Sequence, residues 1–142
     1  MRLLQEIVVR QIATGALRGY LAYVDGVAIG WCNANDKANF PAESANGVRL
    51  PAAPADKREK WIICFEIAPE YRGKGVATAL VNRVLADAKA EGYAAVEGYA
   101  FERTERYEWD FTGPARLYEK LGFVATTKQG NGVIMRKELN DL

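Results

Sequence analysis

The chain has 142 residues, of which 49% are hydrophobic and 26% charged, a composition typical of a single globular domain over residues 1–142. Its 19 basic and 18 acidic residues leave a formal net charge of +1, so we expect no nucleic-acid or membrane partner. Because the chain contains no histidine, Ser-His-Asp and Cys-His catalysis are excluded, and we expect no metal site.

Targeting signals are missing from the sequence. No stretch reaches the roughly 18 uncharged apolar residues of a membrane-spanning helix, and the N-terminus lacks the layout of a signal peptide. We therefore expect a cytoplasmic protein, in which Cys32 and Cys64 are buried small apolar residues in separate strands, without the spacing of a zinc site.

The first third of the chain predicts a helix, a hairpin and a long loop. Apolar residues recur at near-helical spacing over 1–16. Strand-forming runs at 20–24 and 27–31 flank Asp25-Gly26, a strong hairpin signal. Residues 34–60 show no periodicity, which is typical of a functional or mobile loop.

The remainder alternates between strands and helices. The expected strands are 61–68, 94–101, 124–128 and 133–137, and the expected helices are 76–90 and a short one between Pro114 and Gly122. Asn131-Gly132 marks a second hairpin, whereas residues 102–113 form an insert without assignment. This order predicts an α/β fold with a mixed sheet flanked by helices.

A glycine-rich turn joins the strand at 61–68 to the helix at 76–90. Gly73 and Gly75 allow a sharp turn, and the first helical turn offers unpaired N–H donors with a partial positive charge. Arg72 and Lys74 add two full charges. The pattern therefore predicts a seat for a phosphate or pyrophosphate.

Two known phosphate motifs do not fit this turn. A Walker loop needs Ser or Thr after Lys74, and a Rossmann turn needs a third glycine that is missing here. Arg72-x-x-Gly75-x-Ala77 instead resembles the acetyl-coenzyme A signature of the GNAT superfamily of N-acyltransferases. The segment 115–123, Ala-Arg-Leu-Tyr-Glu-Lys-Leu-Gly-Phe, resembles the second signature of the same family.

This resemblance, which covers about residues 17–137, implies a GNAT-like fold with acetyl-coenzyme A as co-substrate. Main-chain groups of Phe65 and Ile67 would pair with the pantetheine amides in a gap between splayed strands. The pyrophosphate would lie against Arg72, Gly73, Lys74, Gly75, Val76, Ala77 and Thr78. The alternative is an ordinary βα turn whose basic side chains are solvated.

The resemblance also implies the catalytic groups. Tyr118 would sit beside the thioester sulfur and protonate the leaving thiolate, or hydrogen-bond to it. An amine must first lose a proton, so Glu66 and Glu97 on the central strands are candidate bases. Ordered water could take the place of both carboxylates as the base. Either carboxylate could instead be held in a salt bridge.

The acceptor side departs from the family pattern. Asn33, Asn35 and Asp36 lie directly after the second predicted strand, where the family places its acceptor loop, although any turn favours such residues. Phe111 stands where family members often have asparagine, and only about sixteen residues precede the first hairpin. The insert at 107–112 could receive a cationic amine or form a solvated loop.

These observations predict an N-acetyltransferase that moves an acetyl group from acetyl-coenzyme A to a primary amine. The reaction would proceed by direct attack through a tetrahedral intermediate, with a small-molecule or peptide amine as acceptor. Family members often form homodimers through their C-terminal strands. The alternatives are a catalytically silent acyl-coenzyme A sensor or subunit, and a nucleotide-binding protein.

Overall fold

A computed structural model of the chain describes residues 6, 10, 12–15, 17–43, 48–102 and 112–139. Most of the predicted helix at 1–16 and residues 103–111, including Phe111, therefore lie outside the described residues. The helical residues 12–14 are followed by Gly15 at φ +80°. No helix in the described ranges is long and apolar enough to cross a membrane.

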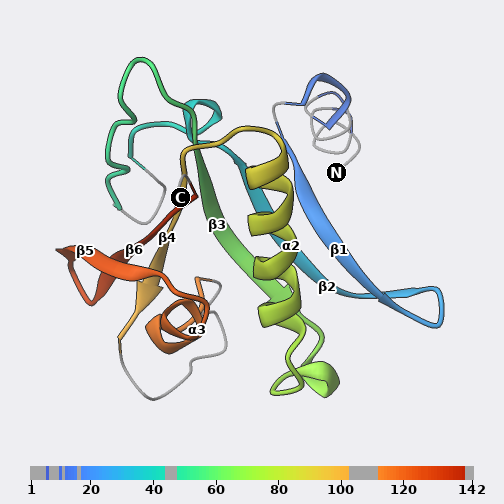
Figure 1. Ribbon diagram of the computed structural model, residues 1–142. Helices are drawn as coiled ribbons and strands as arrows, with labels where there is room; N and C mark the ends of the chain where they lie inside the picture. The colour runs from blue at the N-terminus through green and yellow to red at the C-terminus, as the bar shows by residue number, and fades with distance from the viewer. Residues whose placement is uncertain are drawn as a thin grey trace.

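Six strands form one sheet in the order β1-β2-β3-β4-β6-β5, and β3–β4 is the parallel pair among the described strands. The predicted mixed sheet is thereby confirmed (Figure 1). The strands are β1 (Gly19–Val24), β2 (Val27–Asp36), β3 (Glu59–Ile67), β4 (Ala95–Phe101), β5 (Val124–Gln129) and β6 (Gly132–Glu138). The helices are α2 (Val76–Ala90), α3 (Ala115–Lys120) and the 3₁₀ turns η1 (Lys37–Asn39) and η2 (Pro69–Tyr71).

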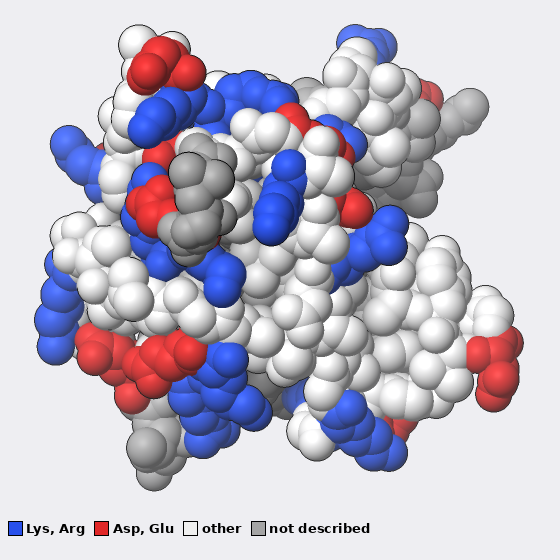
Figure 2. All heavy atoms as spheres, viewed as in Figure 1, with Lys and Arg blue, Asp and Glu red and all other residues white. Residues whose placement is uncertain are grey.

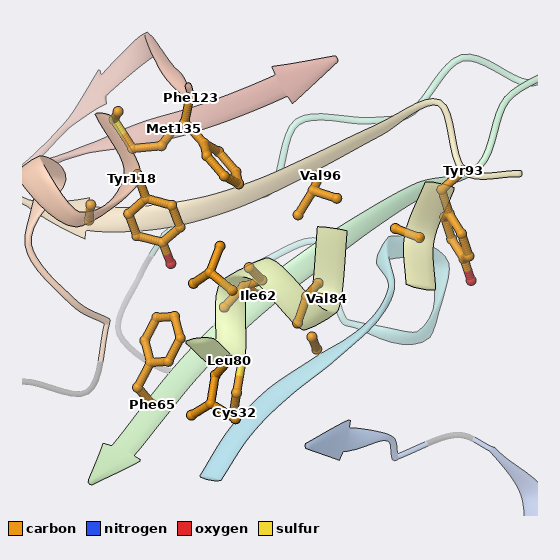
Figure 3. Packing of buried hydrophobic residues seen from close by; sticks show 14 of the residues in the cluster. Cys32, Ile62, Phe65, Leu80, Val84, Tyr93, Val96, Tyr118, Phe123 and Met135 are labelled. Carbon is orange, nitrogen blue, oxygen red and sulfur yellow. The ribbon is translucent and has the colours of Figure 1, made fainter. Parts of the chain in front are cut away.

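Helices α2 and α3 lie on the same face of the sheet, which we call the helix face (Figure 1). The predicted stripe of α2 is confirmed, since Val81, Val84 and Ala88 are fully buried against the sheet. Tyr118 of α3 joins the same core, between Phe123 and the strands (Figure 3). The opposite face carries a smaller apolar cluster of Val48, Leu50, Trp61 and Ile134.

Two sequence predictions were wrong in position. Strand β2 runs to Asp36 rather than ending at 31, because Cys32 and Ala34 alternate inward although asparagines separate them. The second hairpin turns at Gly130-Asn131, one residue earlier than predicted. Gly130 supplies the positive φ of +56°, and Gly132 pairs with Gln129 inside the ladder.

Gly98 is the last residue of β4 that pairs with β3. A Cβ atom at this position would lie 2.8 Å from Tyr118 Oη and 3.2 Å from the ring. The missing side chain therefore lets the phenol pack directly on the strand, at the point where the two strands separate.

We predict that Gly98→Ala lowers the free energy of unfolding by about 1–3 kcal/mol, as overpacking of a core does. The loss should be smaller in a Tyr118→Phe background, because the nearest atom is then removed. Urea unfolding of the two single variants and the double variant measures the coupling. Equal losses of unfolding free energy in both backgrounds would show that packing of the Tyr118 phenol is not the reason for glycine at position 98.

Candidate active site

The ladder between β3 and β4 stops halfway. Pairing covers Glu59 to Ile62 against Ala95 to Gly98, although β3 continues to Ile67 and β4 to Phe101. Beyond Ile62, β3 remains paired with β2, and β4 remains paired with β6. The edge of β3 that faces β4 therefore keeps backbone groups that β4 does not pair, and such groups need other partners.

Tyr118 lies at this interruption. Its ring is fully buried, 6.3 Å from the ring of Phe65 and 5.0 Å from that of Phe123. The hydroxyl points toward the gap between β3 and β4 and lies 3.5 Å from the carbonyl of Thr112 (Figure 3). Burial, together with the nearby thiols of Cys32 and Cys64, raises the pKa of Tyr118 well above its ordinary value, so the phenol stays protonated.

The glycine turn has the geometry expected of an anion seat. Gly73 and Gly75 adopt φ values of +72° and +85°, which other residues rarely reach. No side chain caps the N-terminus of α2, so its first N–H groups point to the turn. The Arg72 Nε–H donates to the carbonyl of Ile67 at 3.1 Å and fastens the turn to the end of β3.

A pocket of about 260 Å³ lies over this turn, at the end of the interrupted ladder. It includes Ile67 at the end of β3 and Pro114, which is bridged to the last residue of β4. Of the residues predicted to hold the cofactor, Phe65 and Lys74 do not line it. Those that do are Ile67, Arg72, Gly73, Gly75, Val76, Ala77 and Thr78.

Two basic residues of α3, Arg116 and Lys120, also line this pocket, and sequence reasoning missed them. Figure 2 shows basic side chains gathered on this face around the start of α2 and beside α3. The sequence places Arg116 and Lys120 on one face of α3, because residues four apart share a helix face. No sequence pattern shows, however, that this face of α3 meets the glycine turn. Arg72, Arg116 and Lys120 together make the pocket cationic.

Glu66 lies on the other face of the sheet. Its neighbours Phe65 and Ile67 are buried in the core beneath α2, so the side chain between them points away from the helices. Glu66 is exposed and borders a hollow of about 220 Å³ that Leu21, Trp31 and Ala68 also line. A carboxylate at this place can accept a proton from a solvated group.

Glu97 is buried in a four-residue ionic cluster on the same face. The Lys37 ammonium donates to Glu59 Oε1 at 2.7 Å and to Glu97 Oε1. Arg136 donates to Glu59 Oε2 at 2.8 Å and lies 3.4 Å from Glu97 Oε2. Burial alone would raise the pKa of Glu59, but the hydrogen bonds from Arg136 and Lys37 outweigh it and lower that pKa.

The three predicted acceptor residues lie in strand β2 rather than in a loop. Asn35 donates from Nδ2 to the carbonyl of Gly15 at 2.9 Å, and Asp36 caps η1 by accepting from Ala38 N–H. Asn35 thus ties β2 to the segment before β1, and Asp36 fixes the start of η1. Asn33 differs, because its Oδ1 is buried and has no partner among the described residues.

Trp61 was also missed by sequence reasoning. Its Nε1–H is buried without a partner in the described part of the chain, and the residue lies opposite Asn35 on β2. Directly opposite residues share a face, and Asn33 lies two positions along the same strand. This face therefore holds one unpaired donor and one unpaired acceptor close to the interruption.

The arrangement suits an extended ligand that carries amides in the interrupted ladder and phosphate groups in the cationic pocket. Backbone groups along β3 and the N–H groups of α2 provide the two halves of such a site. Among the described residues, no group of three or more His, Cys, Asp or Glu side chains could hold a metal ion.

Comparison with known proteins agrees with this arrangement of the site. The acetyltransferase (GNAT) family matches residues 3–123. No curated protein matches the chain. Among solved structures, a protein described as an acetyltransferase of the GNAT family from Desulfovibrio desulfuricans is similar with a TM-score of 0.65 and 19% identity, over 97% of this chain and 80% of that chain.

Two further structures share the fold. The PaiA N-acetyltransferase of Thermoplasma acidophilum, in complex with coenzyme A, has a TM-score of 0.62 and 18% identity, over 95% of this chain and 69% of that chain. A Staphylococcus aureus protein described as an acetyltransferase has a TM-score of 0.61 and 23% identity, over 96% of this chain and 81% of that chain. Because the family match spans most of the sequence, the chain belongs to the acetyltransferase (GNAT) family.

Proposed function

We propose that this protein transfers an acetyl group from acetyl-coenzyme A to a primary amine of a small molecule or peptide. Membership of the family supports acyl transfer in general. The observation that carries the finer proposal is the interrupted β3–β4 ladder, with Tyr118 on the helix face and a cationic pocket at its end.

The donor fits the helix-face side of this site. Pantetheine amides can pair with the backbone edge of β3 between Ile63 and Ile67, which β4 leaves unpaired. The diphosphate can accept from the N–H groups at the start of α2 and from Arg72, Arg116 and Lys120. The coenzyme A complex of the Thermoplasma relative supports this choice of donor.

The acceptor would approach from the opposite face, where Glu66 is exposed. Glu66 takes a proton from the ammonium, directly or through water, and the freed nitrogen lone pair attacks the thioester carbon. The new C–N bond forms in a tetrahedral intermediate, and the nitrogen releases its second proton to water. The C–S bond then breaks, and the thiolate leaves with the electron pair. Desolvation raises the pKa of the Cys64 thiol, which supports direct attack over an acyl-cysteine intermediate.

Tyr118 would act as a hydrogen-bond donor to the sulfur. A phenol of ordinary pKa, about 10, is already a weaker acid than a thiol of about 8.5, and burial raises the pKa of Tyr118 further. Complete transfer of its proton to the thiolate is therefore unfavourable. A fixed O–H dipole in a buried site can still stabilise the charge that develops on sulfur.

The direct test is thiol release from acetyl-coenzyme A across a panel of primary amines. The proposal predicts release that depends on the amine, with acetylated amine formed in equal amount. Coenzyme A binding in titration calorimetry, combined with no release for any amine, would instead identify an acyl-coenzyme A sensor. Binding of ATP without binding of coenzyme A would make the turn a nucleotide site.

Tyr118→Phe should lower kcat by about tenfold or more, because the transition state loses one buried donor. Affinity for coenzyme A should change less than about twofold, since the diphosphate pocket is intact. The wild-type rate should not fall up to pH 10, because the raised pKa keeps the phenol protonated there. A wild-type kcat in the variant would remove Tyr118 from the reaction.

Glu66→Gln and Glu97→Gln should separate the two candidate bases. We expect Glu66→Gln to lower kcat by about 10²-fold or more, with little change in stability, because the side chain is exposed. Glu97→Gln should lower the free energy of unfolding by about 3 kcal/mol, because buried Lys37 and partly exposed Arg136 each lose one of their two carboxylate partners in the cluster.

Steady-state kinetics and urea unfolding of both variants provide the readout. Glu138→Gln is the matched control, since this exposed acid contacts Arg136 outside the buried cluster. A kcat loss confined to Glu97→Gln, with unchanged stability, would reverse the assignment.

A further inference from the structure

The hollow beside Glu66 is apolar apart from that one carboxylate. Its other lining side chains are those of Leu21, Ala28, Ile29, Trp31 and Ala68. Within the described part of the chain, no second charged residue lines it. Its volume of about 220 Å³ is below the roughly 300–1,000 Å³ typical of pockets for drug-sized ligands. The hollow therefore suits a small, mainly apolar ligand with one positive charge.

Three neighbouring strands build this hollow in register (Figure 1). Leu21 of β1 lies opposite Trp31 of β2, and Trp31 lies opposite Glu66 of β3. Neighbouring strands are about 4.8 Å apart, so Leu21 and Glu66 are separated by about 10 Å. A ligand that reaches from the carboxylate to Leu21 therefore needs a chain about as long as that of hexylamine, whereas methylamine would leave the far half of the hollow empty.

The indole of Trp31 lies against strand β1. A Cβ atom on Gly19 would be 2.6 Å from Trp31 Cζ3, so the missing side chain makes room for the ring. Leu21 is two residues further along the same strand, faces the same side and is 51% exposed. The ring and the leucine therefore present apolar surface next to Glu66, and the face of an indole also attracts cations.

An irregularity in the ladder shapes one end of the hollow. The register of β1 against β2 shifts between Ala22 and Tyr23, which leaves Ile29 as an extra residue on β2. Such bulges re-aim a side chain and are common beside functional sites. The carbonyl of Ile29 accepts from Ala68 N–H at 2.8 Å, so these two lining residues are held together.

Glu66 provides the charge that an amine requires. None of the ion pairs within the described residues involves this carboxylate. Glu66 also belongs to the part of β3, from Ile63 to Ile67, that β4 leaves unpaired. An ammonium held by Glu66 is therefore beside the gap between β3 and β4, and its carbon chain can extend across β2 toward β1.

We infer that this hollow binds the acceptor, and that the acceptor is a small primary amine with an apolar alkyl or arylalkyl tail and no second charge. Naming the ligand as the acceptor rests on the proposed acetyl transfer. The ammonium pairs with Glu66 against the face of Trp31, and the tail covers Leu21 and Ala28. A second charged group on the tail would lie on apolar surface without a partner, which is costly.

The first test compares three amines of equal chain length, which are hexylamine, diaminohexane and aminohexanoate. They end in a methyl group, an ammonium and a carboxylate, respectively. The wild-type kcat/KM, measured by thiol release from acetyl-coenzyme A, should be about tenfold or more higher for hexylamine than for either charged analogue. From propylamine to hexylamine, each added methylene should raise kcat/KM by about two- to threefold, because part of the tail stays in contact with water.

The second test changes the walls of the hollow. Leu21→Ala and Trp31→Ala should each lower kcat/KM for hexylamine by about five- to tenfold, whereas Trp31→Phe should keep most of it because a ring remains. Leu21→Glu should reverse the preference, so that diaminohexane becomes the better substrate by about tenfold. Val124→Ala, at an aliphatic residue 63% exposed on β5, is the matched control and should leave these values unchanged.

The third test measures binding without turnover. Hexylamine titrated into the chain saturated with coenzyme A should release heat of binding, and its affinity should fall by about tenfold in Glu66→Gln and in Trp31→Ala. If no amine releases thiol but this binding pattern is found, the transfer proposal fails and the assignment of the hollow stands. Circular dichroism of each variant excludes unfolding as the cause.

Three outcomes would overturn the inference while leaving acetyl transfer open. The first is thiol release with diaminohexane or aminohexanoate at least as efficient as with hexylamine. The second is a set of Leu21 and Trp31 variants that behave like Val124→Ala. The third is the absence of hexylamine binding in calorimetry, whether or not other amines release thiol.

Discussion

The site depends on a strand pair that is prevented from closing. β3 and β4 form a parallel ladder that ends at Ile62 and Gly98, where the Tyr118 ring packs against β4 and faces Phe65 of β3. Leaving buried backbone groups unpaired costs about 1–3 kcal/mol for each group, so a free sheet would close. Each strand keeps its outer neighbour, β2 or β6, and the gap is therefore held by the sheet itself.

The two faces of the sheet are specialised in different ways. The helix face is apolar and keeps Tyr118 protonated, so a neutral donor is available at the gap. The opposite face buries Lys37, Glu59 and Glu97, and the partly exposed Arg136 completes their ionic cluster. A buried cluster is costly to desolvate and more costly to break, so it fixes η1, β3, β4 and β6 relative to one another.

Local signals predicted the local parts of the site. The glycine turn, helix α2 and the Asp25-Gly26 hairpin follow from short-range chemistry, and the structure confirms them. Asn33 and Asn35 were assigned to the acceptor loop that the family resemblance implies, in a position where turns also favour such residues, but pairing with β3 keeps them in a strand.

Long-range contacts could not be predicted in the same way. One ionic partner of Glu97 is Lys37, 60 residues away, and no local pattern connects them. The approach of Arg116 and Lys120 to the glycine turn also depends on how α3 packs beside α2. Sequence reasoning therefore ranked Glu66 only slightly above Glu97, whereas the packing separates the two, because Glu66 is exposed and Glu97 is buried in ion pairs.

The acceptor side of the site extends to strand β1 of the sheet. Leu21 of β1, Trp31 of β2 and Glu66 of β3 lie across from one another and line the same hollow. These side chains shape the approach to Glu66 without contributing to the donor pocket, which lies on the helix face. Changes at Leu21 or Trp31 should therefore affect the amine more than coenzyme A.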